Sequence, residues 1–176
     1  MDNSLPIIYL STLLVILGLS AIFILRQVLK IRKKEVTLGK LQKKLQKEKG
    51  TAQEYYELGS IYLDKKLFVQ AVALLQKALK SKEEIEPENQ GLIYNALGYA
   101  YFAQEQYDLA IRNYKDAVKQ NPSYVTPWNN LGHVYEKKQL ATKALESYEE
   151  ALKYEPENNV AKKRAESLRK RMVSVK

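Results

Sequence analysis

The sequence of 176 residues contains no cysteine and a single histidine, His133. The absence of cysteine excludes disulfides, zinc–cysteine sites, iron–sulfur ligation and thiol catalysis. A single histidine leaves few ways to build a reaction centre, and the sequence shows no phosphate-binding loop, no paired acids in a plausible cleft and no nucleophile with a base. We therefore predict no enzymatic activity, no metal site and no cofactor.

Acidic residues are scarce in one short segment of the chain. Residues 26–49 hold ten Lys or Arg against Glu35 and Glu48, which accounts for +8 of the formal charge of +9. With Asp2 counted, residues 50–176 carry only +2. The basic balance belongs to this segment rather than to the surface of a folded module, so it does not predict nucleic-acid binding.

Charged residues are absent from Asn3 to Leu25, a run of 23 residues rich in Leu and Ile. A helix of that length spans ~34 Å, against ~30 Å for the hydrocarbon core of a bilayer. A cleaved signal peptide would carry positive charge before the apolar run, but Asp2 precedes it and the cations follow. A buried core helix is the other alternative, although such helices rarely stay apolar on all sides for this length. We predict a transmembrane anchor over residues 1–29.

The cations directly after the apolar run predict the topology of this anchor. They are Arg26, Lys30, Arg32, Lys33 and Lys34. Positive residues stay on the side of synthesis, so we expect the body of the protein in the cytoplasm, or in the stroma or matrix of an organelle. The same five side chains are the candidates for contact with the membrane surface.

A short pattern of an aromatic residue, Leu-Gly and Tyr occurs three times in the remainder of the chain. The copies are "YYELGSIY" at 55–62, "YNALGYAY" at 94–101 and "WNNLGHVY" at 128–135. Gly98 and Gly132 are 34 residues apart, whereas Gly59 and Gly98 are 39 apart. The sequence therefore predicts internal repeats, with five extra residues in the connection "SKEEIEPENQ".

Alanines and a closing proline follow these copies at fixed distances. The alanines are Ala71, Ala110 and Ala144, and then Ala78, Ala117 and Ala151. Pro122 and Pro156 close the second and third units, while the first unit has Glu83 at that place. The whole pattern resembles the tetratricopeptide repeat.

The resemblance implies an all-α fold in which helix pairs stack into a solenoid. Within each copy the aromatic residue, Leu, Gly and Tyr fall at i, i+3, i+4 and i+7, one stripe of a helix. No pair can bury its stripe alone, so three pairs share a core and a last helix covers the open end, with Val160, Ala161, Ala165, Leu168 and Met172 as its apolar face. The expected segments are an anchor (1–29), a basic connector (30–51), repeats at 52–85, 91–124 and 125–158, and a capping helix with tail (159–176).

Trp128 and His133 are the only tryptophan and histidine of the chain, and they lie five residues apart. That spacing places them ~140° apart around a helix, so they do not share a face. Trp128 belongs to the packing stripe, and we expect its ring to be buried. His133 lies on the other side with Asn129 and Glu136, where a solvated histidine and a partner contact are both open.

The resemblance also implies a concave groove lined by the first helix of each pair. The groove positions that we select for partner binding are Tyr56, Leu92, Asn95, Tyr99, Phe102, Asn129 and His133. The three aromatic residues among them have no place in the packing stripes, so we expect exposed anchors for a protein partner. The asparagines and His133 can bind a peptide backbone by hydrogen bonds. Alternatively, the amino-terminal segment or the cap folds over this face.

The basic connector, residues 30–51, places Leu38, Leu41 and Leu45 on one helical side and Lys on most others. It reads as an amphipathic helix. Beside a membrane it can lie on anionic lipid, where each cation contributes ~1 kcal/mol. In the alternative interpretation, the cations only fix the membrane topology, and the leucines of the connector pack on the first repeat. RNA binding is disfavoured because no aromatic residue interleaves with the lysines.

The anchor, the length of the body and the repeats together resemble a small membrane-protein family of plastids and cyanobacteria, hypothetical chloroplast open reading frame thirty-seven. The resemblance implies an adaptor at the thylakoid membrane that assists photosystem I assembly or stabilisation. Its body would face the chloroplast stroma, or the cytoplasm of a cyanobacterium, and bind photosystem I subunits or assembly factors. A mitochondrial outer-membrane preprotein receptor and a bacterial inner-membrane scaffold stay open as alternatives.

Overall fold

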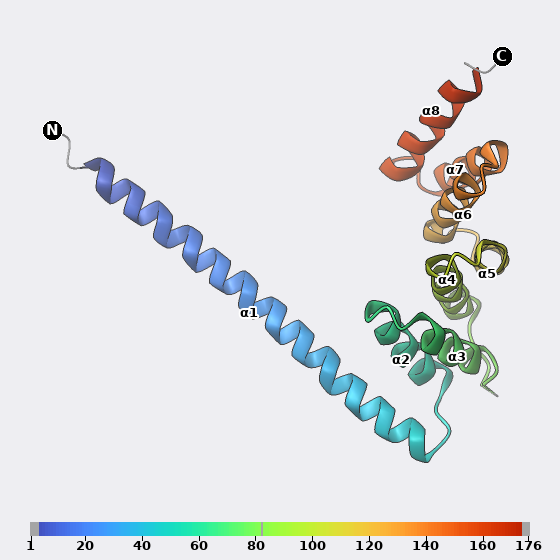
Figure 1. Cartoon of the computed structure of the whole chain (residues 1–176), viewed down its shortest axis with the longest axis horizontal. Helices are drawn as coiled ribbons and strands as arrows, with labels where there is room; N and C mark the ends of the chain where they lie inside the picture. The colour runs from blue at the N-terminus through green and yellow to red at the C-terminus, as the bar shows by residue number, and fades with distance from the viewer. Residues whose placement is uncertain (1–3, 82, 174–176) are drawn as a thin grey trace. The chain divides into compact units, whose positions relative to one another are not determined.

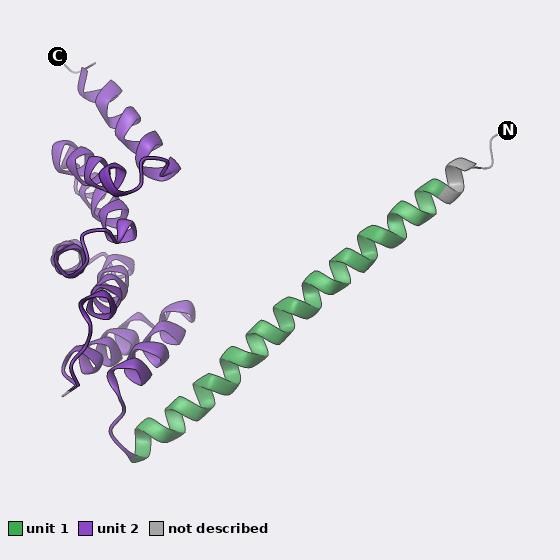
Figure 2. Cartoon of the chain, turned by 180° about the vertical axis from the view of Figure 1, so that it is seen from behind, with its two compact units in different colours: residues 1–47 green, residues 48–176 purple. Residues whose placement is uncertain are grey.

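The computed structural model describes residues 4–81 and 83–173, and within these ranges the chain is helical and contains no strand. Eight α-helices follow one another in this part of the chain. They fall into two compact units, residues 1–47 and residues 48–176 (Figure 2). The predicted all-α fold is confirmed.

The first unit is a single helix, α1 (Ser4–Lys47), of 44 residues. At 1.5 Å per residue it is ~66 Å long. Among the described helices α1 alone is long and apolar enough to cross a membrane, judged by length and composition. The hydroxyls of Ser11 and Thr12 donate to the carbonyl oxygens of Ile8 and Tyr9 at 2.9 Å each, so these polar groups are satisfied within the helix.

The boundary expected between an anchor ending at residue 29 and a connector beginning at residue 30 falls inside α1, which continues without a break. Residues 26–38 contain no Gly or Pro that would stop a helix. The apolar run and the basic segment are therefore parts of one element.

Seven helices make up the second unit, and each packs against the next along the chain (Figure 1). They pair as α2 with α3, α4 with α5 and α6 with α7, and α8 follows the last pair. Their bounds are α2 (Ala52–Asp64), α3 (Phe68–Leu79), α4 (Pro87–Ala103), α5 (Tyr107–Gln120), α6 (Val125–Lys137), α7 (Ala141–Tyr154) and α8 (Asn159–Val173).

Local sequence signals fix the starts of α2 and α4. Thr51 and Glu54 form a capping box, in which each side chain accepts a hydrogen bond of 3.1 Å from the other residue's backbone N–H. Pro87 begins α4, where its missing N–H costs nothing. Pro87–Gln90 add a turn ahead of Gly91, which aligns with Ala52. Four of the five extra residues expected in a loop thus extend a helix.

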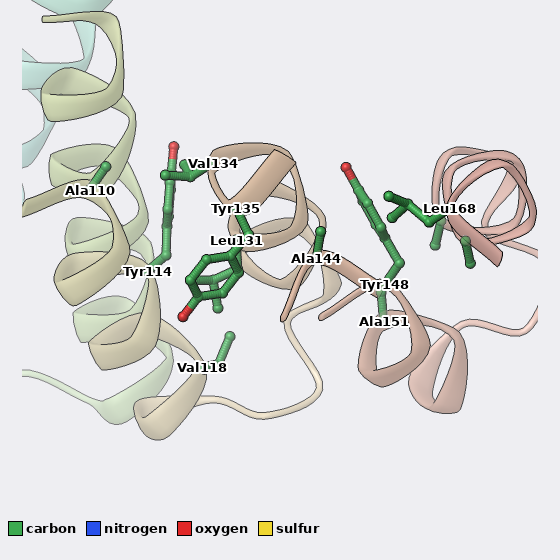
Figure 3. Packing of buried hydrophobic residues seen from close by; sticks show 12 residues of the cluster. Ala110, Tyr114, Val118, Leu131, Val134, Tyr135, Ala144, Tyr148, Ala151 and Leu168 are labelled. Carbon is green, nitrogen blue, oxygen red and sulfur yellow. The ribbon is translucent and has the colours of Figure 1, made fainter. Parts of the chain in front are cut away.

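Glycine and tyrosine make the close contact within the second and third helix pairs. Gly98 lies against the ring of Tyr114, and Gly132 against that of Tyr148; a Cβ on either glycine would lie 2.5 Å from the nearest ring atom. Both rings are almost completely buried, at 1% exposure (Figure 3). The helices can approach this closely because glycine has no side chain.

The first pair keeps the pattern with a different partner. Leu75 replaces the tyrosine, and a Cβ on Gly59 would lie 3.0 Å from it. The predicted small residues pack as expected in all three pairs, with no exposed surface on Ala71, Ala78, Ala110, Ala117, Ala144 or Ala151. Two buried clusters, one in the first half of the solenoid and one in the second, form its core.

The capping helix α8 buries a narrower stripe than expected. Ala161, Ala165 and Leu168 are buried and follow an i, i+4, i+7 spacing on the side that packs against α7. The expected burial of Val160 and Met172 is wrong, since they are 57% and 36% exposed. Val160 lies ~80° around the helix from Leu168, the nearest residue of the stripe, and a single neighbouring helix covers only a narrow arc. Met172 continues the stripe but lies one residue before the end of α8.

The turn between the two helices of each pair contains a residue with positive φ. These residues are Lys66, Glu105 and Gln139, with φ of 60°, 59° and 59°. They recur with the repeat, 39 and then 34 residues apart. The left-handed region favours glycine, so each side chain here adds local strain.

Candidate functional site

The seven predicted groove residues all lie on the first helix of a pair. Tyr56 is on α2, and His133 and Asn129 are on α6. The remaining four are on α4: Leu92, Asn95, Tyr99 and Phe102. Tyr99 and His133 are exposed, and the other five are half-buried.

The aromatic groove residues Tyr99 and Phe102 make ring contacts within their own repeat and with the neighbouring ones. The centroid of the Phe102 ring lies 5.0 Å from that of His133 and 5.8 Å from that of Tyr107. Tyr99 meets Phe68 edge to face at 6.2 Å and remains 46% exposed. The expectation of three exposed aromatic anchors is wrong for Phe102 and Tyr56, because neighbouring helices cover part of each ring.

The two groove asparagines make hydrogen bonds within the solenoid. Asn95 donates to the Tyr124 hydroxyl at 3.1 Å and accepts from the side-chain amide of Asn130 at 3.0 Å. Asn129 donates to Oδ1 of Asn158 at 3.3 Å. Amide groups that we expected to bind a peptide backbone are therefore largely used in hydrogen bonds within the solenoid.

Charged groups surround His133 on the face formed by α6 and α8. Partial burial lowers the pKa of His133, and the cations Arg164 and Lys137 lower it further, against the opposing effect of Glu136. At neutral pH the imidazole is therefore uncharged, and it can both donate and accept a hydrogen bond.

A small cavity of about 160 Å³ brings together two of the groove residues, Tyr56 and Leu92. Its wall includes the acidic residues Glu83, Glu84 and Glu86 of the loop between α3 and α4. The repeat positions that define the groove do not include this acidic wall, because its residues lie in the connection between α3 and α4. The closely spaced glutamates of the stretch "KEEIEPE" are the sequence feature that predicts it.

Trp128 is half-buried rather than fully buried. Its indole N–H donates to the carbonyl oxygen of Pro122 at 3.0 Å, and its ring packs at the edge of the second core cluster. The expectation of a buried ring is wrong because the neighbouring Pro127 and Leu131 occupy the centre of the packing.

The five predicted membrane-surface residues are exposed on α1: Arg26, Lys30, Arg32, Lys33 and Lys34. At 100° per residue, all but Arg32 fall within an arc of ~80–100° on one side of the helix. In the part of the chain that the structure describes, no group of three or more His, Asp or Glu could hold a metal ion.

Family models match all three repeats. Models described as "Tetratricopeptide repeat" match residues 52–85 and 125–158, and one described as "TPR repeat" matches residues 91–139. Among solved structures, a crystal structure of MamA superposes with a TM-score of 0.69 at 24% identity, over 79% of this chain and 80% of that one. That likeness supports the solenoid fold.

Two relatives resemble the chain along nearly its whole length. The ycf37 protein of Cyanophora paradoxa is 37% identical over 167 residues, which cover 93% of this chain and 95% of the relative. The chloroplastic tetratricopeptide repeat domain-containing protein PYG7 of Arabidopsis thaliana is 37% identical over 171 residues. That match covers 97% of this chain but only 56% of PYG7.

Proposed function

The chain belongs to the ycf37 family of tetratricopeptide-repeat proteins, and from this premise we propose that it is a membrane-anchored, non-catalytic adaptor assisting photosystem I assembly or stabilisation. Tetratricopeptide-repeat domains bind protein partners, and the relative PYG7 is chloroplastic by name. Photosystem I is the client implied by the resemblance seen in the sequence.

One observation carries the proposal: an exposed apolar helix precedes a repeat domain in the same chain. The helix anchors the protein as a single span in the thylakoid membrane. Arg26, Lys30, Arg32, Lys33 and Lys34 lie at the stromal surface against anionic lipid headgroups, with the repeats on the same side.

Sealed thylakoid vesicles with the stromal face outward test this topology. Added protease should digest the repeat domain and leave a fragment ending near residue 30. The protein should resist extraction by alkaline carbonate. Protection of the repeats would reverse the orientation, and release by carbonate would rule out a span.

The groove set supplies the proposed client contact, with Tyr99 as exposed anchor and the neutral His133 beside Phe102. Crosslinking in detergent-solubilised thylakoids should capture photosystem I subunits or assembly factors. Tyr99→Ala with His133→Ala should reduce capture while the Tm stays within a few degrees of the parent, because both side chains are exposed. Capture that excludes photosystem I proteins would overturn the assignment of the client.

A preprotein receptor is a second candidate, favoured by the acidic wall beside Tyr56. Such a receptor would bind basic presequences, and Glu84→Lys should then abolish binding of a basic amphipathic peptide. Retained photosystem I accumulation in cells lacking the protein, together with presequence binding in vitro, would favour this candidate.

A further inference from the structure

A second cavity opens between the second and third helix pairs, away from the groove set. Its volume is about 630 Å³. The floor is apolar and is formed by Leu131, Tyr135 and Val118, all buried, with Trp128 beside them. Trp128 lies ~140° around α6 from His133, so a ligand in this cavity would not touch the groove.

Three lysines line this cavity: Lys115 and Lys119 on α5, and Lys143 on α7. All three are exposed. The lining also contains Glu146 and Glu150, and Glu150 accepts a hydrogen bond of 2.5 Å from Lys153. Lys153 thus pairs with Glu150, and Glu146 is the other carboxylate in the lining. The cavity therefore presents three lysines to a ligand against the single charge of Glu146.

The equivalent interface between the first and second pairs lacks this arrangement. Gln76 and Leu109 stand there in place of Lys115 and Lys143, Lys80 repeats the cation of Lys119, and Arg112 stands in place of Glu146. Gln76 donates to the Tyr101 hydroxyl at 3.1 Å. The repeat fold does not require the lysine cluster, because one interface is built without it.

We propose that this cavity binds an acidic segment of a protein client. An apolar or aromatic client side chain lies against Trp128 and Tyr135, and flanking Asp or Glu carboxylates pair with Lys115, Lys119 and Lys143. An aromatic floor supplies anchoring and the lysines supply charge complementarity. The proposal rests on the adaptor function and adds a partner chemistry and a surface outside the groove.

The only tryptophan of the chain lies in the cavity wall, so its fluorescence reports occupancy directly. The experiment titrates the full chain in neutral detergent with the synthetic peptide acetyl-EEDLFDEE-amide. The emission of Trp128 should shift and saturate, and binding should weaken in 0.5 M NaCl because salt screens the ion pairs. The neutral peptide acetyl-QQNLFNQQ-amide should bind at least about tenfold more weakly.

Charge-reversal variants separate a specific site from general attraction. Lys119→Glu and Lys143→Glu should each weaken the acidic peptide about fivefold or more, whereas Lys80→Glu, the equivalent change at the other interface, should not. Glu146→Gln should tighten binding. These side chains are exposed, and circular dichroism checks that each variant remains folded.

The proposal is overturned if Trp128 emission does not respond, if the neutral peptide binds equally well, or if Lys80→Glu weakens binding as much as Lys119→Glu. Crosslinked capture of thylakoid proteins by the parent chain is measured alongside. If the parent chain captures thylakoid proteins but its Trp128 emission does not respond to the peptide, the result counts against this cavity alone. If the parent chain captures no thylakoid protein, the result counts against the adaptor function itself.

Discussion

The hydroxyl of Tyr148 on α7 donates a hydrogen bond of 2.8 Å to Oε1 of Glu136 on α6. The other oxygen of this carboxylate lies 3.6 Å from the guanidinium groups of Arg164 and Arg171 on α8. The Glu136 side chain is only 15% exposed. One carboxylate thus links the last helix pair to the capping helix.

Tyr148→Phe should destabilise the repeat domain by about 1.5 to 3 kcal/mol, because it removes a hydrogen bond to a charged, half-buried acceptor. Tyr114→Phe is the matched control, since Phe102 stands there in place of Glu136 and offers no acceptor. It should change the free energy of unfolding by less than about 0.5 kcal/mol. Urea unfolding of the full chain in detergent, followed by circular dichroism, compares the two. Equal losses would show that the bond to Glu136 contributes nothing specific.

Gly132→Ala should destabilise the third pair by about 1 to 3 kcal/mol, because the new Cβ would meet the buried Tyr148 ring at 2.5 Å. Gly59→Ala should cost less, since its Cβ would meet Leu75 at 3.0 Å and a leucine side chain yields more easily than a ring between helices. The same urea unfolding measures both variants. A larger loss for Gly59→Ala would contradict this account of the packing.

Replacing the positive-φ residues by glycine should stabilise the domain. Lys66→Gly, Glu105→Gly and Gln139→Gly each remove a Cβ from the left-handed region and should each raise the free energy of unfolding by about 1 kcal/mol. Gly placed at the preceding C-cap residue Lys65 or Lys138, where φ is −84° or −85°, is the control and should not stabilise. Thermal unfolding of the triple variant should show additive gains, because the three turns are far apart in sequence and belong to different pairs.

The lowered pKa of His133 predicts a pH dependence of stability. The unfolded chain binds a proton near pH 6.5 while the folded chain still does not, so this contribution is fully present above pH 6.5 and is lost as the pH falls through the folded pKa. The groups facing His133 are Phe102, Lys137, Glu136 and Arg164. The Tm should fall between pH 7.5 and pH 5.5, and His133→Gln should flatten this slope. An unchanged slope in the variant would assign the effect to other groups.

The repeat spacing predicted the helix pairs and the buried alanines because glycine and alanine recur at the points where two helices approach most closely. It did not predict which aromatic residue fills the centre. Trp128 and Tyr148 are both large rings at repeat positions, but the space against Gly132 goes to Tyr148, and this depends on how two helices cross.

The groove residues were placed on the correct helices by repeat position alone, yet their exposure was not predictable. Phe102 is partly covered by His133, a residue 31 positions later, and Asn95 is bound by Tyr124 at the end of its own repeat and by Asn130 of the next repeat. Such contacts join different repeats, and periodicity within one repeat carries no information about them. The acidic wall at Glu83, Glu84 and Glu86 was not predicted because these residues lie in the connection between α3 and α4, whereas the groove positions all lie on the first helix of a pair.

Because α1 is unbroken, the helical twist fixes the orientation of its carboxyl end relative to the apolar run. Residues 30–47 rise ~27 Å beyond the apolar run, and every residue inserted there would turn Lys47 by ~100° about the helix axis and advance it by ~1.5 Å. Two insertions would leave the far end rotated by ~200°, whereas seven would return it to within ~20° of its original phase. The length of this segment therefore sets an angle as well as a distance, which a flexible tether of the same composition would not do.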